Sequence, residues 1–256
     1  MRVPVRQADV EAPVRDAPEI DVESVLVCPR RHLRSRRLRL LVALVMVLAP
    51  RRVRRFLAVR LLGHDVHPRA HLGRALVDVD RLVMDEGSVI SAGNVIRGCE
   101  LVLLERDAKM GMFNLVNSVR RDTGFYAGVD RLPSLVMRRA ALITTLHVID
   151  ACARVEFGPW GTLAGFGSLV QTHSVDFEAV RQDALPVSVG DHALVMSRSV
   201  LLPGSSVPDA SLIAAGGVVS RALPDEPALY GGVPVKAVRP LDPTAAFFVR
   251  RAVDVH

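Results

Sequence analysis

Six aliphatic residues recur at intervals of six along residues 189–219, with no position missed. They are Val189, Val195, Leu201, Val207, Ile213 and Val219. A small residue lies two positions before each later member, in the order Ala193, Ser199, Ser205, Ser211 and Gly217. A helix repeats near 3.6 residues and a single strand at 2, so a period of six fits neither. It is typical of a solenoid in which each hexapeptide forms one short strand and one corner.

The composition agrees with the narrow interior of a solenoid. Half of the 256 residues are hydrophobic but only 4% are aromatic, and Val, Ile, Leu and Ala fill such an interior. The three cysteines, Cys28, Cys99 and Cys152, are isolated and form no CxxC pair. We interpret them as reduced thiols of a cytoplasmic protein, because neither a disulfide framework nor a zinc site has this spacing.

Residues 1–23 carry six acidic side chains, three prolines and no long apolar run. A secretory signal would need such a run. We therefore expect an acidic, flexible N-terminal tail.

Residues 24–63 predict a basic helical hairpin. Eleven arginines and no acidic residue lie between residues 30 and 60. Among them, 40–49 is a run of ten apolar residues and 53–62 is a second amphipathic stretch. Ten residues are half of what a membrane span needs. Two compatible interpretations stay open, a cap over the open end of the solenoid and an anchor on an anionic membrane surface, such as the inner face of a membrane.

The six-residue spacing extends back to residue 64, so residues 64–240 are predicted as the solenoid domain. Before residue 110 two registers compete. One runs through Val66, Leu72, Met84, Ile90, Ile96, Val102 and Ala108, and the other through Val83, Val89, Val95 and Leu101. The pattern lapses between residues 110 and 141, which we expect to be irregular.

Twenty residues separate Leu169 from Val189, two more than three hexapeptides. The surplus predicts a solvated loop within residues 174–187, directly after His173. Loops that leave a rigid scaffold often carry binding groups. Residues 241–256 are predicted as a short C-terminal helix, with Pro243 near its start.

Five stretches within residues 142–240 carry a family pattern: Ile143–Asp150, Leu163–Ser168, Gln171–Asp176, Gly190-Asp191 and Tyr230–Pro240. The last is similar to a closing phrase G-x-P-A-K-x-I-R-x. With these stretches the chain resembles the hexapeptide-repeat acyltransferases, of the sugar O-acetyltransferase type related to maltose and galactoside acetyltransferases. The resemblance implies an all-β solenoid that winds as a left-handed parallel β-helix. It also implies a homotrimer with active sites between adjacent subunits and acetyl-CoA as the acetyl donor.

His173 is the candidate catalytic base. A protonated hydroxyl is a poor nucleophile, and an imidazole that titrates near neutral pH suits the removal of its proton. His147 and Asp150 occur together in the subgroup that the chain resembles. We therefore expect His147, Asp150 and Asp176 to bind or orient the acceptor, although each also fits a structural role at a corner.

The coenzyme is expected to contact a second group of residues. Ser197 matches the position from which a backbone amide stabilises the oxyanion in the family, although Met196-Ser197 replaces the usual pair of glycines. Ala215 and Gly216 are small enough for the pantetheine chain to pass along the backbone. Lys236 and Arg239 lie in the closing phrase and suit phosphate recognition.

The resulting hypothesis is an acetyl-CoA-dependent O-acetyltransferase that acts on a hydroxyl of a sugar, a polysaccharide precursor or a glycosylated small molecule. Two alternatives stay open, an N-acetyltransferase that acts on an amino sugar and a catalytically silent trimeric scaffold, with or without membrane contact. No metal requirement is expected, because the histidines have no metal-ligand spacing. Nucleic-acid binding is not expected either, because aromatic residues do not alternate with the arginines.

Overall fold

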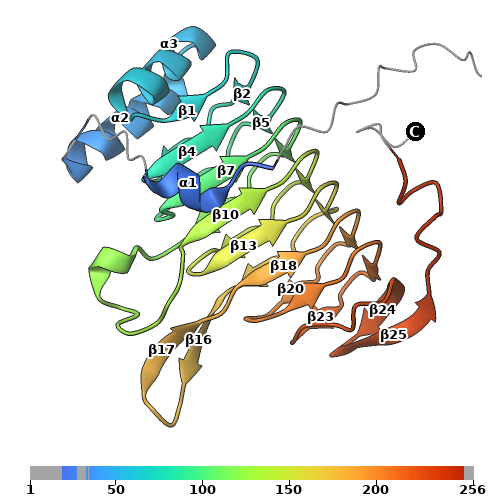
Figure 1. Cartoon of the computed structure of the whole chain (residues 1–256). Helices are drawn as coiled ribbons and strands as arrows, with labels where there is room; N and C mark the ends of the chain where they lie inside the picture. Colours follow the sequence, from blue (N-terminus) through green and yellow to red (C-terminus); the bar gives the residue numbers. More distant parts are fainter. Residues whose placement is uncertain (1–18, 28–32, 34, 251–256) are drawn as a thin grey trace, which may run out of the picture.

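The chain winds into a solenoid whose three faces are parallel β-sheets. The computed structural model describes residues 19–27, 33 and 35–250. Each coil passes through sheet A, then sheet B, then sheet C, and the same order repeats along the axis (Figure 1). All strand pairs within these sheets are parallel except the last pair of sheet B. The structure therefore has the all-β, parallel architecture that the six-residue period predicts.

Each sheet takes one strand from each coil. Sheet A contains β1 (Asp65–Val66), β4 (Arg81–Met84), β7 (Leu101–Leu104), β10 (Ser134–Met137), β13 (Arg154–Phe157), β18 (Val187–Val189) and β21 (Ser206–Val207). Sheet B contains β2 (His71–Leu72), β5 (Val89–Ile90), β8 (Lys109–Met110), β11 (Leu142–Ile143), β14 (Thr162–Leu163), β19 (Leu194–Val195), β22 (Leu212–Ile213), β24 (Ala228–Gly232) and β25 (Val235–Pro240). Sheet C contains β3 (Leu76–Asp78), β6 (Val95–Arg97), β9 (Leu115–Asn117), β12 (Val148–Asp150), β15 (Leu169–Gln171), β20 (Val200–Leu201) and β23 (Val218–Val219).

The six-residue ladder forms the core of the C-terminal coils. All six of its members are buried and belong to one continuous hydrophobic cluster. The small residues before them are buried at the corners, where they leave room for the backbone to turn; Ser199 and Ser211 are fully buried. The spacing of the ladder therefore predicted both the strands and the corners correctly.

The register before residue 110 follows the first of the two competing patterns. Residues of that pattern, such as Met84, Ile90 and Ile96, are buried, whereas Val89 and Val95 of the other pattern lie on the outer face. The prediction of an irregular segment over 110–141 was too broad. Strands β8 and β9 continue the coil, and only residues 118–133 leave it before β10 begins.

A second departure follows β15 and is more regular than the predicted loop. Residues 173–184 form an antiparallel hairpin of β16 (His173–Asp176) and β17 (Arg181–Ala184). The core residue of β15 is Val170, so the placement of Leu169 on the core pattern was wrong. The corner before β15 holds two glycines with positive φ, Gly165 and Gly167, and its extra residue shifts the inward position by one.

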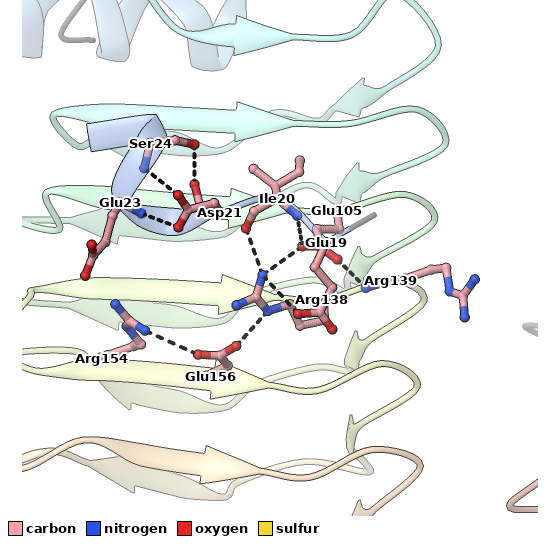
Figure 2. Close-up of polar contacts among 10 residues, drawn as sticks. All are labelled: Glu19, Ile20, Asp21, Glu23, Ser24, Glu105, Arg138, Arg139, Arg154 and Glu156. Carbon is pink, nitrogen blue, oxygen red and sulfur yellow. Dashed lines mark hydrogen bonds and ion pairs between the residues drawn. The ribbon is translucent and has the colours of Figure 1, made fainter. Parts of the chain in front are cut away.

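Residues 19–23 contradict the prediction of a flexible tail up to residue 23. Ile20 and helix α1 (Val22–Val27) lie on the outer face of sheet A, where Val22 is buried against Leu101 and Val136. Figure 2 shows the polar contacts that hold this segment: the Ile20 amide donates to Glu105 Oε1 at 3.0 Å, and Arg138 Nη1 donates to the Ile20 carbonyl at 3.0 Å. The acidic residues 1–18 lie outside the described part of the chain.

Helices cover the end of the solenoid that begins with β1 (Figure 1). They are α2 (Arg36–Leu48), α3 (Arg51–Phe56) and the π-helical turn η1 (Leu57–Leu61). Met46, Ala58 and Leu62 join the solenoid core. The buried Arg54 ties the helices to the first coil, because its guanidinium donates to the carbonyls of Met46, Ala49 and Leu72. No helix in the described residues is long and apolar enough to cross a membrane.

The predicted C-terminal helix is absent from the described residues 241–250, which form a series of turns. The Asp242 carboxylate accepts hydrogen bonds from the backbone amide and the hydroxyl of Thr244. This local bonding closes a turn in place of the first helical hydrogen bonds. Residues 251–256 lie outside the described part.

Candidate active site

Both departures from the coil leave the same edge of the solenoid. The segment 118–133 connects β9 to β10, and the hairpin lies between β15 and β18, so each runs from sheet C to sheet A. We call this edge the C–A edge, and the corners between sheets B and C the B–C edge. The two departures project on one side of the molecule (Figure 1). The corner between them connects β12 to β13.

A histidine and an aspartate pair on the C–A edge. His173 Nδ1 is in hydrogen-bond contact with Asp150 Oδ2. The same carboxylate accepts the backbone amides of Cys152 at 3.1 Å and His173 at 3.2 Å, so its position is fixed from several sides. Asp150 ends β12 and His173 begins the hairpin one coil further on, where β12 pairs with β15. The parallel register of sheet C therefore brings the two residues together.

The pair has the arrangement of a base and its orienting group. A carboxylate at Nδ1 holds the ring and favours the tautomer with the proton on that nitrogen. The lone pair of Nε2, on the far side of the ring, is then available for a proton. The His173 side chain is 44% exposed, whereas that of Asp150 is 13% exposed, so the base faces solvent and its partner does not.

Three further side chains surround this pair, and no sequence motif marks them. Cys152 is buried beside Asp150, and burial, with the adjacent carboxylate, raises the pKa of its thiol to about 11. Burial also raises the pKa of the Tyr126 phenol, which packs near Cys152. Arg131 lies over the Tyr126 ring at 4.1 Å and donates to the carbonyls of Val119 and Cys152 at 2.6 and 2.7 Å. Arg131 therefore fastens the segment 118–133 to the corner that carries the pair.

His147 lies apart from this pair, and its surroundings fit a structural role better than the predicted contact with the acceptor. It lies inside the solenoid, 1% exposed. Its Nδ1 accepts the Ser168 amide at 3.2 Å and its Nε2 lies 3.0 Å from Thr144 Oγ1. Burial lowers the pKa of His147 to about 4. The residue is therefore a neutral, fully hydrogen-bonded part of the wall.

Asp176 lies at the far end of β16 and organises the turn of the hairpin. Its carboxylate accepts the backbone amides of Ala179 and Glu178, and these bonds, with Arg181 nearby, lower its pKa. These contacts fit a turn-forming role better than the predicted acceptor contact.

The predicted coenzyme residues Ser197, Ala215 and Gly216 lie on the B–C edge, at corners of two successive coils. The Gly216 amide donates to the Ser197 carbonyl at 3.0 Å, which stacks one corner on the next. Sheet C separates these corners from the C–A edge. Within one chain, the structure therefore does not bring these residues to His173.

Lys236 and Arg239 lie on β25, in the hairpin that ends the solenoid. Lys236 pairs with Gly231 and Arg239 pairs with Leu229. Because the register shifts between Leu229 and Tyr230, the two cations lie on the same face of the hairpin. Lys236 also lines a cavity of about 370 Å³ together with Arg221. Two cations at one cavity could hold the phosphates of a coenzyme.

Among the residues that the structure describes, one group of side chains has the composition of a metal site. Ligand atoms of Asp150, Cys152 and His173 lie within 4.8 Å of one another. The spacing of histidines alone could not predict this cluster, because it combines an aspartate, a cysteine and a histidine from two coils. The i, i+2 pair Asp150 and Cys152 was the only local signal.

No protein-family model and no curated protein matches this sequence. Solved structures match its fold. A polysialic acid O-acetyltransferase, OatWY, aligns with 69% of this chain and 84% of its own length, at a TM-score of 0.55 and 11% identity. A hexapeptide-repeat acetyltransferase from Vibrio cholerae aligns with 88% of this chain and 96% of its own length, at a TM-score of 0.42 and 16% identity. A maltose O-acetyltransferase from Clostridium difficile 630 aligns with 85% of this chain and 89% of its own length, at a TM-score of 0.41 and 12% identity. The OatWY alignment shows that this chain shares the solenoid fold of that protein.

Proposed function

We propose that the protein is an acetyl-CoA-dependent O-acetyltransferase whose acceptor is a hydroxyl of a sugar or a glycosylated molecule. The observation that carries the proposal is the pair on the C–A edge, in which Asp150 holds His173 Nδ1 and leaves the opposite ring nitrogen toward solvent. The fold that the chain shares with a polysialic acid O-acetyltransferase supports the reaction class. The proposal includes the left-handed winding that the sequence resemblance implies.

In the proposed reaction, His173 Nε2 removes the hydroxyl proton as the oxygen attacks the thioester carbonyl. The tetrahedral intermediate then collapses, the carbon–sulfur bond breaks, and the imidazolium returns the proton to the departing thiolate. Asp150 stabilises the imidazolium between these two steps. A backbone amide at Ser197 is the proposed donor to the oxyanion.

The proposed role of Ser197 beside His173 requires a second copy of the chain, because the two residues lie on opposite sides of sheet C. The outer face of sheet C, between the two edges, carries one continuous apolar column, with one member in every coil. Its members are Leu76, Val95, Leu115, Val148, Leu169, Val200 and Val218. A polar column lies beside it toward the C–A edge, consisting of Asp78, Arg97, Asn117, Asp150 and Gln171. On sheet A, by contrast, α1 covers the apolar part of the outer face. We propose that sheet C faces a three-fold axis.

This arrangement explains how separate edges form one site. The face toward the axis is bounded by the C–A edge on one side and by the B–C edge on the other. In a closed ring, the C–A edge of each subunit then meets the B–C edge of its neighbour. His173 of one subunit would act beside Ser197, Ala215 and Gly216 of the partner subunit. Lys236, Arg239 and Arg221 would hold the coenzyme phosphates.

The experiment that tests the proposal is an assay of thiol release from acetyl-CoA with a panel of sugars. Wild-type protein is expected to turn over with at least one sugar, and His173→Ala is expected to lose this activity. Ala215→Trp is expected to block the coenzyme side of the site on the B–C edge. When the His173→Ala and Ala215→Trp proteins are mixed and exchange subunits, some sites combine an intact His173 with an intact Ala215, so activity is expected to return. Equal background rates of wild type and His173→Ala with all acceptors would instead favour a silent scaffold. A preference for amino sugars would favour N-acetyl transfer.

We also propose that α2, α3 and η1 contact an anionic membrane surface as a peripheral attachment, on the cytoplasmic side. Large apolar side chains form an exposed stripe on these helices, consisting of Leu38, Leu41, Leu44, Val45, Leu48, Val53 and Phe56. Exposed arginines border it, namely Arg36, Arg37, Arg51, Arg52 and Arg60. No acidic residue occurs between Glu23 and Asp65, so the surface has one sign of charge. An apolar stripe with basic borders suits the interface of an anionic bilayer.

A three-fold assembly would strengthen this contact. The helices lie at one end of the solenoid, so three solenoids around a parallel axis present three such surfaces on the same side.

The test of membrane contact is sedimentation with phosphatidylglycerol-containing and phosphatidylcholine vesicles. Wild type is expected to bind only the anionic vesicles at low salt and to be released by salt. Leu41→Glu/Val45→Glu is expected to abolish binding, and the control Val233→Glu/Val238→Glu, at exposed sites on the opposite end, is expected to retain it. Equal recovery with both kinds of vesicle would contradict the proposal.

A further inference from the structure

We propose that Asp150, Cys152 and His173 form a binding site for a soft divalent cation of the zinc class, and that the bound ion blocks the catalytic base. The three side chains come from two positions in the coil. Asp150 and Cys152 lie two residues apart at the corner after β12, and His173 follows β15 on the adjacent coil. Their ligand atoms lie within 4.8 Å of one another.

The chemistry of the donors points to zinc rather than to magnesium or calcium. Carboxylate oxygen, thiolate sulfur and imidazole nitrogen are all zinc ligands, whereas magnesium and calcium prefer oxygen alone. Ligands on one tetrahedral zinc ion lie about 3 to 4 Å apart, as follows from bond lengths of about 2.0 to 2.3 Å. The observed cluster therefore needs only small side-chain movements to hold an ion.

The charges of the complex also balance. A carboxylate and a thiolate together carry two negative charges, which a divalent cation neutralises, and the imidazole adds none. The Cys152 thiol releases its proton to solvent when the sulfur–metal bond forms. Cys152 is buried and the Asp150 side chain is only 13% exposed, and a neutral complex suits such an environment.

The site is also held in place and open to solvent. Arg131 fixes the corner through the Cys152 carbonyl at 2.7 Å, and its two terminal nitrogens donate to this and other backbone carbonyls. His173 is the exposed member of the set, so an ion can enter from its side. Three protein ligands leave a fourth position for water.

Binding of the ion is incompatible with base catalysis. If Nδ1 is the ligand, Nε2 carries the ring proton and has no lone pair to accept another. If Nε2 is the ligand, its lone pair is already used. This consequence depends on the proposed acetyltransferase function, but binding of the metal does not.

The experiment is a titration of the chelator-treated full-length protein with Co²⁺, which reports thiolate ligation through a sulfur-to-cobalt charge-transfer band. One Co²⁺ per chain is expected, and Zn²⁺ is expected to displace it. Cys152→Ser is expected to lose the band and to weaken Zn²⁺ affinity at least about 100-fold. This effect exceeds that of removing a residue that only hydrogen-bonds to a metal ligand, which typically weakens affinity by about 10- to 100-fold. The matched control is Cys28→Ser/Cys99→Ser, in which Cys152 is the only remaining cysteine and the band is expected to persist.

Every result of this titration bears on the site. A wild-type protein without the band at millimolar Co²⁺ would overturn the proposal, and so would a band that survives in Cys152→Ser or disappears in the double control with its fold intact. His173→Gln provides a second test, with at least about tenfold weaker Zn²⁺ binding expected. Inhibition of thiol release by Zn²⁺ is measured separately. An inactive protein that still gives the Cys152-dependent band would refute the acetyltransferase and leave the metal site standing.

Discussion

The C–A edge and the B–C edge are built from the same repeat, but they differ in regularity. Along the B–C edge the corners are short and stack directly, as the Gly216 amide does on the Ser197 carbonyl. Along the C–A edge the chain leaves the coil twice, over 118–133 and in the β16–β17 hairpin. The ionisable pair lies on the interrupted edge. The comparison indicates that interruptions position reactive side chains, while the regular edge forms a wall of small residues, which the proposed trimer places against a neighbouring subunit.

The largest effect is expected on the interrupted edge. His173→Ala should lower kcat by about 10² to 10⁴, the range typical of a lost general base, and Asp150→Asn should lower it less because the imidazole remains. The measurement is thiol release at saturating acetyl-CoA. Asp176→Asn is the matched control, since it changes a carboxylate at the turn of the same hairpin, and it should stay within about twofold of wild type. A comparable loss in the control would mean that the whole hairpin matters and not the pair.

The next prediction concerns the face that joins the two edges. Val148→Arg places a charge in the apolar column of sheet C, and in the proposed trimer this charge would be buried between subunits, so the substitution should dissociate the assembly. Light scattering should then report the mass of one chain, and thiol release should fall with it. Leu194→Arg makes the same change on the outer face of sheet B and should leave the mass unchanged. A Val148→Arg protein of unchanged mass would place the subunit contact elsewhere.

His147 offers a test of the wall beneath the B–C edge. Its pKa is lowered by burial from 6.5 to about 4, so the folded protein holds the neutral ring while the unfolded chain takes up a proton below pH 6.5. This contribution to stability is present above pH 6.5 and is lost as the pH falls toward 4, by roughly 3 kcal/mol. The difference in unfolding free energy between wild type and His147→Gln should shrink by this amount from pH 7 to pH 4 in urea titrations. A constant difference would mean that His147 is not buried in the neutral form.

The smallest expected effect lies at the closing hairpin. Lys236→Ala should raise KM for acetyl-CoA about tenfold and leave kcat within about twofold, because one charge-assisted hydrogen bond contributes about 1.5 kcal/mol. Lys109→Ala is the control, since Lys109 is the other lysine of the chain and lies on β8, away from the closing hairpin. Equal KM values for wild type and Lys236→Ala would remove Lys236 from the coenzyme site.

Much of the fold could be predicted from the sequence, because every rung of a solenoid meets the same environment. The repeated aliphatic positions at Val189 and Val195 each mark one strand of a coil that faces a uniform core. Predictions failed where that uniformity ends. The Gly165–Gly167 corner contains an extra residue, so the inward position moved to Val170. The turn at Asp242 replaced the expected helix through a local side-chain bond.

The candidate site was predictable only in its central residue. His173 adjoins a break in the period, and chemistry marks it as a base. His147 has the same side chain, but burial makes it neutral and structural, and no local pattern separates the two. Tyr126 and Arg131 reach the site from a segment that lies about forty residues before His173 in the sequence, through contacts that join coils.

The sequence by itself determined the repeat, the core positions of the C-terminal coils and the basic, acid-free helical segment, because these depend on residue type at fixed spacing. The tertiary structure alone decided which edge each functional residue occupies. It placed Asp150 against His173 and set Cys152 beside them, and it kept Ser197 on the opposite side of sheet C. The physical reason is that parallel stacking brings together residues about one coil apart, while the sheet between two edges separates residues that are close in sequence.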